Sequence, residues 1–177
     1  MSKKFSRQII PCRMDFVNCW EAKSFNGSEP KYRICAIIPK SNLEVISLLN
    51  KSIEQAKQDY LYLWGGKIPE NLKLPLHDGD LERSNDEAYK GCIFFNATST
   101  YPPEVVDLKV KPIINHDDVY SGCHANISIN FYGYSVDGSN GIAVGLGNIQ
   151  KTFDDENLAL RNRAVDEFQV LEDSFLS

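Results

Sequence analysis

The stretch Cys123–Tyr134, CHANISINFYGY, has the clearest β pattern in the chain. Its odd-numbered residues from Cys123 to Phe131 are small or apolar, whereas its even-numbered residues from His124 to Tyr134 are polar or aromatic. Period-two alternation of this kind is typical of a strand with one buried face and one wet face. Tyr132 and Tyr134 fall on the face predicted to be wet, unless a loop or a helix covers them.

Further runs with strand composition flank this segment, and one helix is inserted among them. Ser41 and Glu44 have the spacing of a capping box. An apolar stripe with helical spacing follows, made of Leu43, Ile46, Leu49, Ile53, Ala56 and Tyr60. The other strand-like runs are 5–22, 32–39, 91–99 and 141–153, with a weaker one at 105–113. This pattern predicts a mainly β, five-stranded Greek-key barrel of the oligonucleotide-binding (OB-fold) type with long loop insertions, and a β-sandwich is the alternative.

Length and composition bound the class of protein. The 177 residues are 42% hydrophobic and 24% charged, which suits a single globular domain with a packed core. No apolar run is long enough to span a membrane, and the N-terminus leads into no signal-peptide core. We therefore expect a soluble cytoplasmic protein without a membrane partner. The five cysteines form no CxxC pair, so we expect reduced, mostly buried thiols and no zinc site.

Charge divides the chain into two segments. Residues 1–153 carry 17 Lys or Arg and 17 Asp or Glu. Residues 154–177 carry two Arg and seven Asp or Glu, which accounts for the whole net charge of −5. We therefore predict a binding domain over 1–153 and an acidic C-terminal tail over 154–177.

Aromatic and basic residues interleave in the predicted strands as a single-strand binder requires. Stacking of a base on an exposed ring contributes about 1–3 kcal/mol without sequence readout. Phe94 and Phe95 point to opposite faces of their strand, and we assign Phe94 to the core and Phe95 to a groove. The predicted stacking residues are thus Tyr132, Tyr134, Phe95 and Tyr101. The predicted phosphate contacts are Lys31, Arg33, Lys90, Lys109, Lys111 and Lys151.

Motifs for catalysis are weaker. Gly65-Gly66-Lys67 lacks the spacing of a P-loop, and Gly145-Leu146-Gly147 precedes no helix. Three carboxylates in the long loop 67–90 could hold Mg²⁺ in a metal-dependent nuclease, namely Asp78, Asp80 and Glu82. A turn-rich acidic loop explains the same residues without a metal. We therefore expect no catalytic residue, cofactor or metal, and keep the nuclease as an alternative.

Four longer motifs resemble a known family. They are WGGKIPENLKLPLHDGD (64–80), DEAYKGCIFFNATS (86–99), VYSGCHANISINFYGY (119–134) and GIAVGLGNIQK (141–151). These runs resemble the bacteriophage single-stranded DNA-binding proteins once catalogued as a domain of unknown function, over about residues 10–168. The resemblance implies an OB fold, sequence-independent binding of single-stranded DNA in phage replication or recombination, no catalysis, and a place in the bacterial host cell. A phage structural or interaction protein built as a β-sandwich remains an alternative.

The acidic tail is predicted to compete with DNA and to recruit partners. A tethered anionic segment has a high effective concentration and competes with phosphates. Tails of other single-strand binders recruit replication proteins, and this tail is similar to them. Its candidate partner-binding residues are Asp166, Glu167, Phe168, Glu172, Asp173 and Phe175. The alternative is helical packing in a homodimer contact, through Leu158, Leu160, Val165 and Phe168.

Overall fold

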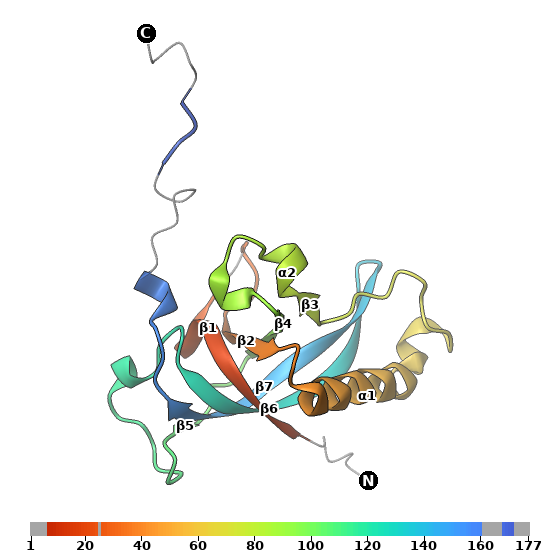
Figure 1. Cartoon of the computed structure of the whole chain (residues 1–177). Helices are drawn as coiled ribbons and strands as arrows, with labels where there is room; N and C mark the ends of the chain where they lie inside the picture. The colour runs from red at the N-terminus through yellow and green to blue at the C-terminus, as the bar shows by residue number, and fades with distance from the viewer. Residues whose placement is uncertain (1–6, 25, 161–167, 172–177) are drawn as a thin grey trace.

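Five long strands form a closed barrel (Figure 1). The computed structural model describes residues 7–24, 26–160 and 168–171. The barrel strands are β1 (Gln8–Lys23), β2 (Lys31–Pro39), β4 (Cys92–Ser99), β6 (His124–Val136) and β7 (Ser139–Phe153). Antiparallel pairs join β2 to β1 and β4, and β6 to β1 and β7, and a parallel pair between β4 and β7 closes the circuit. The predicted five-stranded OB-type barrel is confirmed.

Short elements decorate the barrel. β3 (His77–Asp78) pairs with β4, and β5 (Val105–Val106) pairs with β7. The predicted loop 67–90 contains β3, a one-turn helix α2 (Gly79–Glu82) and a 3₁₀ turn η2 (Glu87–Tyr89). Further 3₁₀ turns are η1 (Leu61–Trp64), η3 (His116–Asp118) and η4 (Leu158–Leu160). Among the described residues, no helix combines the length and the apolar character needed to cross a membrane.

The core lies inside the barrel because alternate residues of each strand point inward. Ile34, Ala36 and Ile38 of β2 are fully buried, as are Ile127 and Ile129 of β6. Four of the five cysteines are buried, all five thiols are free, and Cys92 is half-buried. Burial raises the pKa of the Cys19 thiol to about 12, which keeps it protonated and unreactive. The expectation that the thiols are mostly buried is therefore confirmed.

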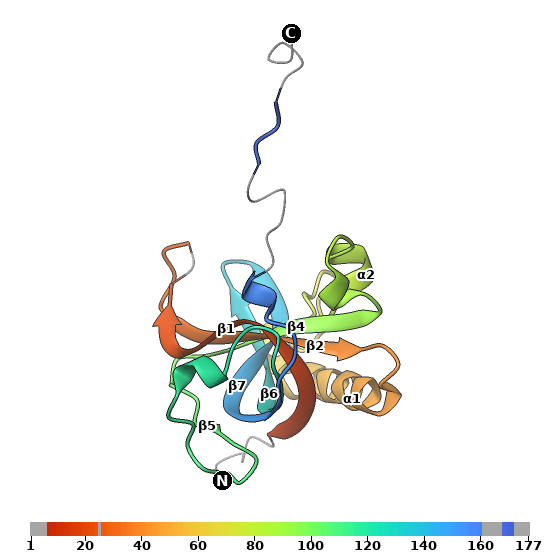
Figure 2. The same ribbon diagram turned by 60° about the vertical axis from the view of Figure 1, so that its left-hand side comes forward.

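The helix α1 (Leu43–Asp59) lies against β6 through Leu49, Ile53 and Ala56, which are buried. Its N-cap is Asn42, whose side-chain oxygen accepts a hydrogen bond from Val45 N–H. The predicted cap at Ser41 is therefore wrong by one residue. Leu43, the first residue of the helix, is 74% exposed. Figure 2 shows α1 and α2 on opposite sides of β2 and β4.

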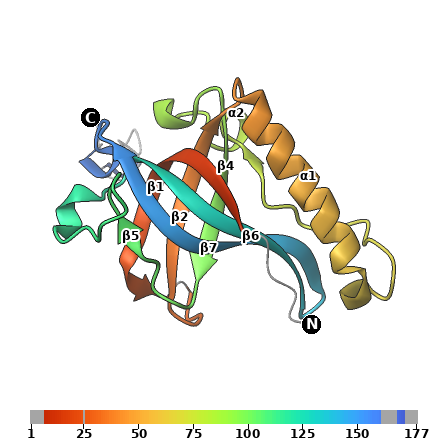
Figure 3. The ribbon, with the colours of Figure 1, turned by 90° about the horizontal axis from the view of Figure 1, so that it is seen from below.

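β6 and β7 continue past the barrel as a hairpin arm toward the end of α1 (Figure 3). Gly133 meets Tyr60 and Trp64 there, and a Cβ at position 133 would lie 2.6 Å from the Tyr60 Cβ. Trp64 Nε1 also donates a hydrogen bond to the Tyr134 carbonyl at 3.2 Å. Glycine is therefore required at position 133, because the backbone of the arm approaches these aromatic residues closely.

Candidate nucleic-acid interface

An outward-facing row of residues runs around the barrel across its five strands. Strand pairing places Asn18 opposite Arg33, and Arg33 opposite Thr98. It also places Thr98 beside Gly145, and Gly145 opposite Asn130. None of the row belongs to the buried apolar core. Register thus brings side chains from both halves of the sequence onto one outer surface.

One part of this outer surface is covered by a second apolar cluster. It contains Cys35, Ile37, Tyr89, Phe94 and Leu158, all of them buried. Tyr89 comes from η2 and Leu158 from η4, so two loop segments fold over the outer sides of β2 and β4.

Both phenylalanines of β4 are therefore buried. Phe95 is 0% exposed inside the barrel, and Phe94 is 4% exposed on the outer side beneath Tyr89. The barrel core thus holds Phe95 and not Phe94, so the predicted exposure of Phe95 for stacking is wrong, and Phe94 is buried in the outer cluster instead. The two rings do point to opposite faces, as a strand requires, but each face has its own apolar cover.

Beside this covered part lies a hollow of about 480 Å³. Strands β1, β2 and β4 line it together with residues of two loops. We call it the basic hollow, and its main residues are Phe16, Asn18, Lys23, Arg33, Arg83 and Asn96. Three of its lining side chains are cations and none is a carboxylate. An anionic chain is therefore favoured here over the neighbouring surface.

The predicted residues near the basic hollow are Lys31, Arg33 and Tyr101. Arg33 lines it, and Lys31 lies two residues away on β2, opposite Lys23. Tyr101 is 79% exposed and follows the end of β4, where Ser99 pairs with Tyr32. These residues share one end of the β2–β4 pair.

Tyr132 and Tyr134 lie on the outer face of the arm, the same face as Asn130. Both are half-buried. The Tyr134 ring crosses to Gly141 on β7, where a Cβ would collide with its hydroxyl and with the Lys73 carbonyl. The neighbouring loop therefore covers part of this face, and the rings keep partial exposure.

The other predicted cations are scattered. Lys90 precedes the opposite end of β4, and Lys109 and Lys111 lie in the turn after β5, where the Asp107 carboxylate accepts hydrogen bonds from both of their N–H groups. Lys151 Nζ lies 2.6 Å from an Asp154 carboxylate oxygen and 5.5 Å from the Tyr120 ring centroid. The structure does not gather these four with Arg33.

The acidic loop uses its carboxylates for structure. Lys40 Nζ lies 2.7 Å from Asp78 and 2.8 Å from Asp80, and His77 lies 3.0 Å from Glu82. The pKa of the Asp80 carboxyl is lowered mainly by the hydrogen bond that it accepts from the Gly91 N–H, and also by Lys40. Within the ranges that the structure describes, no group of His, Cys, Asp and Glu has an arrangement suited to a metal ion. These contacts account for the carboxylates without a metal.

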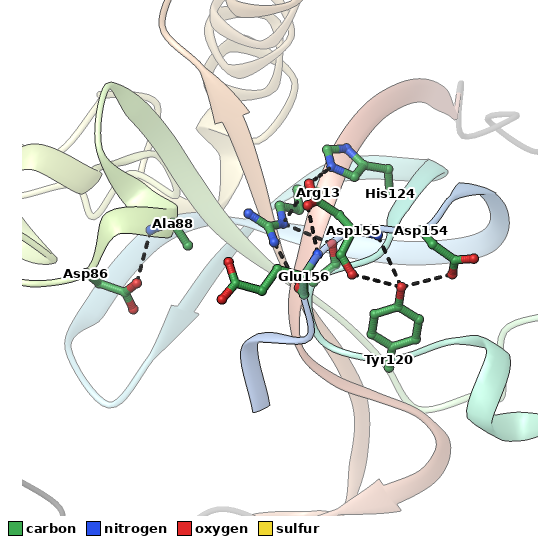
Figure 4. A network of polar contacts seen from close by, with 9 residues as sticks. Arg13, Asp86, Ala88, Tyr120, His124, Asp154, Asp155 and Glu156 are labelled. Atoms are coloured by element: carbon green, nitrogen blue, oxygen red, sulfur yellow. Dashed lines mark hydrogen bonds and ion pairs between the residues drawn. The ribbon is translucent and has the colours of Figure 1, made fainter. Parts of the chain in front are cut away.

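The first residues after β7 form a strap, residues 154–160, that packs back on the barrel (Figure 4). Arg13 donates to the Glu156 carbonyl at 2.9 Å, and His124 Nε2 lies 2.8 Å from an Asp155 oxygen. His124 lowers the pKa of the Asp155 carboxyl. The Leu158 N–H bonds the Ser121 carbonyl at 2.7 Å, and Ser121 lines the basic hollow. The predicted boundary at 153/154 thus coincides with the end of β7, and residues 154–160 beyond it still pack on the barrel.

Most of the predicted tail residues lie outside the described residues, namely Asp166, Glu167, Glu172, Asp173 and Phe175. Phe168 is described and is 72% exposed. In the predicted helical packing, Leu158 is buried against the chain's own barrel and Leu160 is 75% exposed. Val165 of that prediction also lies outside the described residues.

Several residues of the basic hollow were not predicted from the sequence. Phe16, Asn18 and Lys23 belong to β1, which has imperfect alternation, and Arg83 belongs to a loop. Asn96 was available from the sequence, since it alternates with Phe95 and Ala97 on β4. Once Phe95 is assigned to the core, Asn96 must face outward.

The sequence is similar to those of known phage proteins. A model of the family of Enterobacter phage Enc34, ssDNA-binding protein, matches residues 7–175. Protein p50 of Acyrthosiphon pisum secondary endosymbiont phage 1 is 28% identical, over 78% of each sequence.

Solved structures share the fold. The single-stranded DNA-binding protein from bacteriophage Enc34 in complex with ssDNA superimposes with a TM-score of 0.78 at 20% identity, covering 88% of this chain and 90% of that one. The single-stranded DNA-binding protein encoded by bacteriophage T7 superimposes with a TM-score of 0.51 at 14% identity, covering 92% of this chain and 99% of that one. Because the family match spans nearly the whole sequence, this chain belongs to the phage Enc34 single-stranded DNA-binding protein family.

Proposed function

We propose that this protein binds single-stranded DNA without sequence preference, across the outer face of its barrel. The observation that carries the proposal is the basic hollow, which joins three cations, an exposed ring and amide side chains from β1, β2, β4 and the loop after α2. This is the face that OB folds use for oligonucleotides. Family membership supports the same function.

The proposed path of the strand follows the outward row. It starts at the basic hollow, crosses Thr98 and Gly145, and continues past Asn130 toward the arm. Tyr132 lies opposite Ala143, two residues before Gly145 on β7, so it comes next along the path. We propose Tyr101, Tyr132 and Tyr134 as stacking groups, because each keeps an exposed or half-exposed ring on this surface.

Phosphates are proposed to bind the cations at the hollow. Lys31 and Arg33 were predicted for this role, and Lys23 and Arg83 join them through their place in the hollow. Each neutralised phosphate releases counterions, so affinity should fall steeply with salt. Lys90, Lys109, Lys111 and Lys151 stay predictions as peripheral contacts.

The protein is proposed to act by binding alone. The nuclease alternative depended on Asp78, Asp80 and Glu82, and these carboxylates pair with Lys40 and His77. Incubating labelled single strands with the protein and Mg²⁺ tests this point. Intact strands are expected, and cleavage that is lost on Asp80→Asn would support the nuclease.

The acidic tail is proposed to compete with DNA for the basic hollow. Support comes from the strap, because the Leu158 N–H donates to the carbonyl of Ser121, a residue that lines the hollow, so the described part of the segment after β7 reaches the rim. Deleting residues 169–177 should tighten binding at matched salt. A second variant, with the tail acids replaced by their amides, should do the same if charge is responsible. Unchanged affinity in both would contradict competition.

We infer a role in phage DNA replication or recombination, in the cytoplasm of the bacterial host. The acidic tail would then recruit the other proteins of that process. Family membership supports this context. A pull-down from infected cells with full-length protein, compared with the 169–177 deletion, tests the recruitment.

Fluorescence anisotropy of a labelled oligonucleotide tests the main proposal. Binding to a dT oligonucleotide should exceed binding to a duplex of equal length. The log–log slope against salt should be about −0.7 for each phosphate contacted. Absence of binding to any single strand at low salt would favour a structural or interaction protein instead.

A further inference from the structure

Phe16 has a backbone conformation that is unusual for a bulky residue. Its φ is +46°, in the left-handed region, where a side chain crowds the following carbonyl oxygen. It lies in a β-bulge. Asp15 pairs with Cys35 and Asn18 pairs with Arg33, so two residues of β1 between these pairs lie opposite a single residue of β2. Bulges of this kind redirect a side chain, often at functional sites.

The bulge turns the Phe16 ring outward. Ile10, Cys12 and Met14 alternate into the core, so an unbroken strand would bury residue 16 as well. Instead the ring is 45% exposed and lines the basic hollow. A large aromatic side chain at a position that the alternation predicts to be buried thus lies at the surface, among cations.

Hydrogen bonds fix this arrangement in place. The Asp15 carboxylate accepts from Phe16 N–H at 2.8 Å and from the Tyr89 hydroxyl at 2.6 Å. The Val17 N–H donates to Ser121 Oγ at 3.2 Å, which ties the next residue to the rim. Asp15 is 2% exposed, so its geometry is set by the fold. The backbone that carries the ring is therefore held in place, which reduces the conformational entropy lost on binding.

A cation supports the ring. The Arg83 guanidinium carbon lies 5.5 Å from the Phe16 centroid, 5.4 Å from that of Tyr89 and 5.5 Å from that of Phe94. Two of these rings are buried, and Phe16 is the one with free area. Phosphate-binding charge and a flat apolar face therefore occur side by side in one hollow.

We propose that Phe16 stacks on an unpaired base and is the residue that makes the basic hollow prefer single strands over duplex. This inference rests on the proposed function and adds a specificity-determining residue to it. A duplex offers the same phosphates, but its base faces are already stacked on each other. Cations alone would bind both forms, whereas an exposed ring favours the form with free bases.

The test compares two oligonucleotides of equal length, one of dT and one made entirely of abasic sites. Both carry the same phosphates, so their affinity ratio reports base contacts. Phe16→Ala should lower affinity for dT about 5- to 150-fold, the range for one lost base–aromatic stack. It should leave affinity for the abasic strand nearly unchanged. Phe16→Trp and Phe16→Tyr should retain the preference for dT.

Two further variants guard against structural explanations. Phe16→Gly removes the ring while permitting the same positive φ, so it should match Phe16→Ala in binding. Tyr62→Ala removes a ring that is 71% exposed on η1, outside the hollow, and should bind as the wild type does. Melting curves establish that each variant is folded.

The outcomes separate this inference from the function on which it rests. Equal losses on dT and abasic strands, or no loss on either, would overturn the stacking role of Phe16 while wild-type binding to dT still upheld the function. A wild type that binds neither strand would overturn both. A selective loss on dT, with Phe16→Trp restoring it, supports the inference.

Discussion

Neutralising two cations of the basic hollow should reduce the salt dependence of DNA binding by a calculable amount. The perturbation is Lys23→Gln with Arg33→Gln, two lining residues on neighbouring strands. If each contacts one phosphate, the log–log slope should become shallower by about 1.4, from about 0.7 per contact on single strands. Between about 50 and 200 mM salt, the wild type should therefore lose about sevenfold more affinity than the variant.

Anisotropy titrations with a dT oligonucleotide at four salt concentrations give both slopes. The matched control is Lys51→Gln with Lys57→Gln, which changes net charge equally but lies on α1. That helix lies on the side of β2 and β4 opposite α2, away from the hollow (Figure 2). Equal slopes for the wild type and the Lys23/Arg33 variant would refute the hollow as the phosphate site. Equal changes in both variants would mean that net charge alone is responsible.

Three further predictions concern stability and use urea denaturation. Tyr89→Phe should lower the free energy of unfolding by about 1.5–3 kcal/mol, because a buried carboxylate loses a charge-assisted hydrogen bond, while the exposed control Tyr62→Phe should change it by less than about 0.5. Leu158→Ala should cost about 2–5 kcal/mol, since this strap residue buries its side chain in the outer apolar cluster, and a smaller loss would show that the strap is loosely packed. His124 lowers the pKa of Asp155, so the stability that this carboxylate contributes is complete above its unfolded-state pKa of about 4. That stability is lost as pH falls through the lower folded-state pKa. Asp155→Asn should therefore lose less stability than the wild type on acidification.

The strands and their connection could be predicted because alternation is local. Each residue of β6 from His124 to Asn130 has the burial that its side of the pattern predicts, and so does Cys123 just before the strand. A glycine of β7 also has a structural reason that involves the paired strand, since Gly141 leaves room for the Tyr134 ring. Such pairings follow from register, which a hydrophobic pattern specifies strongly when one face is buried.

The site was harder to predict because it depends on contacts between distant segments. Phe94 is buried because loop residues, Tyr89 among them, fold over the outer side of β4, and a loop sequence does not reveal that return. In the sequence, Asp78 and Asp80 are compatible with a metal site. In the fold, Lys40, which precedes α1 in the chain, forms ion pairs with both of them. Phe16 follows the core pattern of β1 in sequence, and only the bulge turns it outward.

Photo-crosslinking tests the central claim most directly. A dT oligonucleotide carrying 5-iododeoxyuridine is bound to the full-length protein, irradiated and mapped by mass spectrometry. We predict crosslinks on the outer face of β1, β2 and β4, with Phe16 among them, and a second group at Tyr132 on the arm. Crosslinks confined to α1, or to the turn that holds Lys109 and Lys111, would contradict binding across the basic hollow.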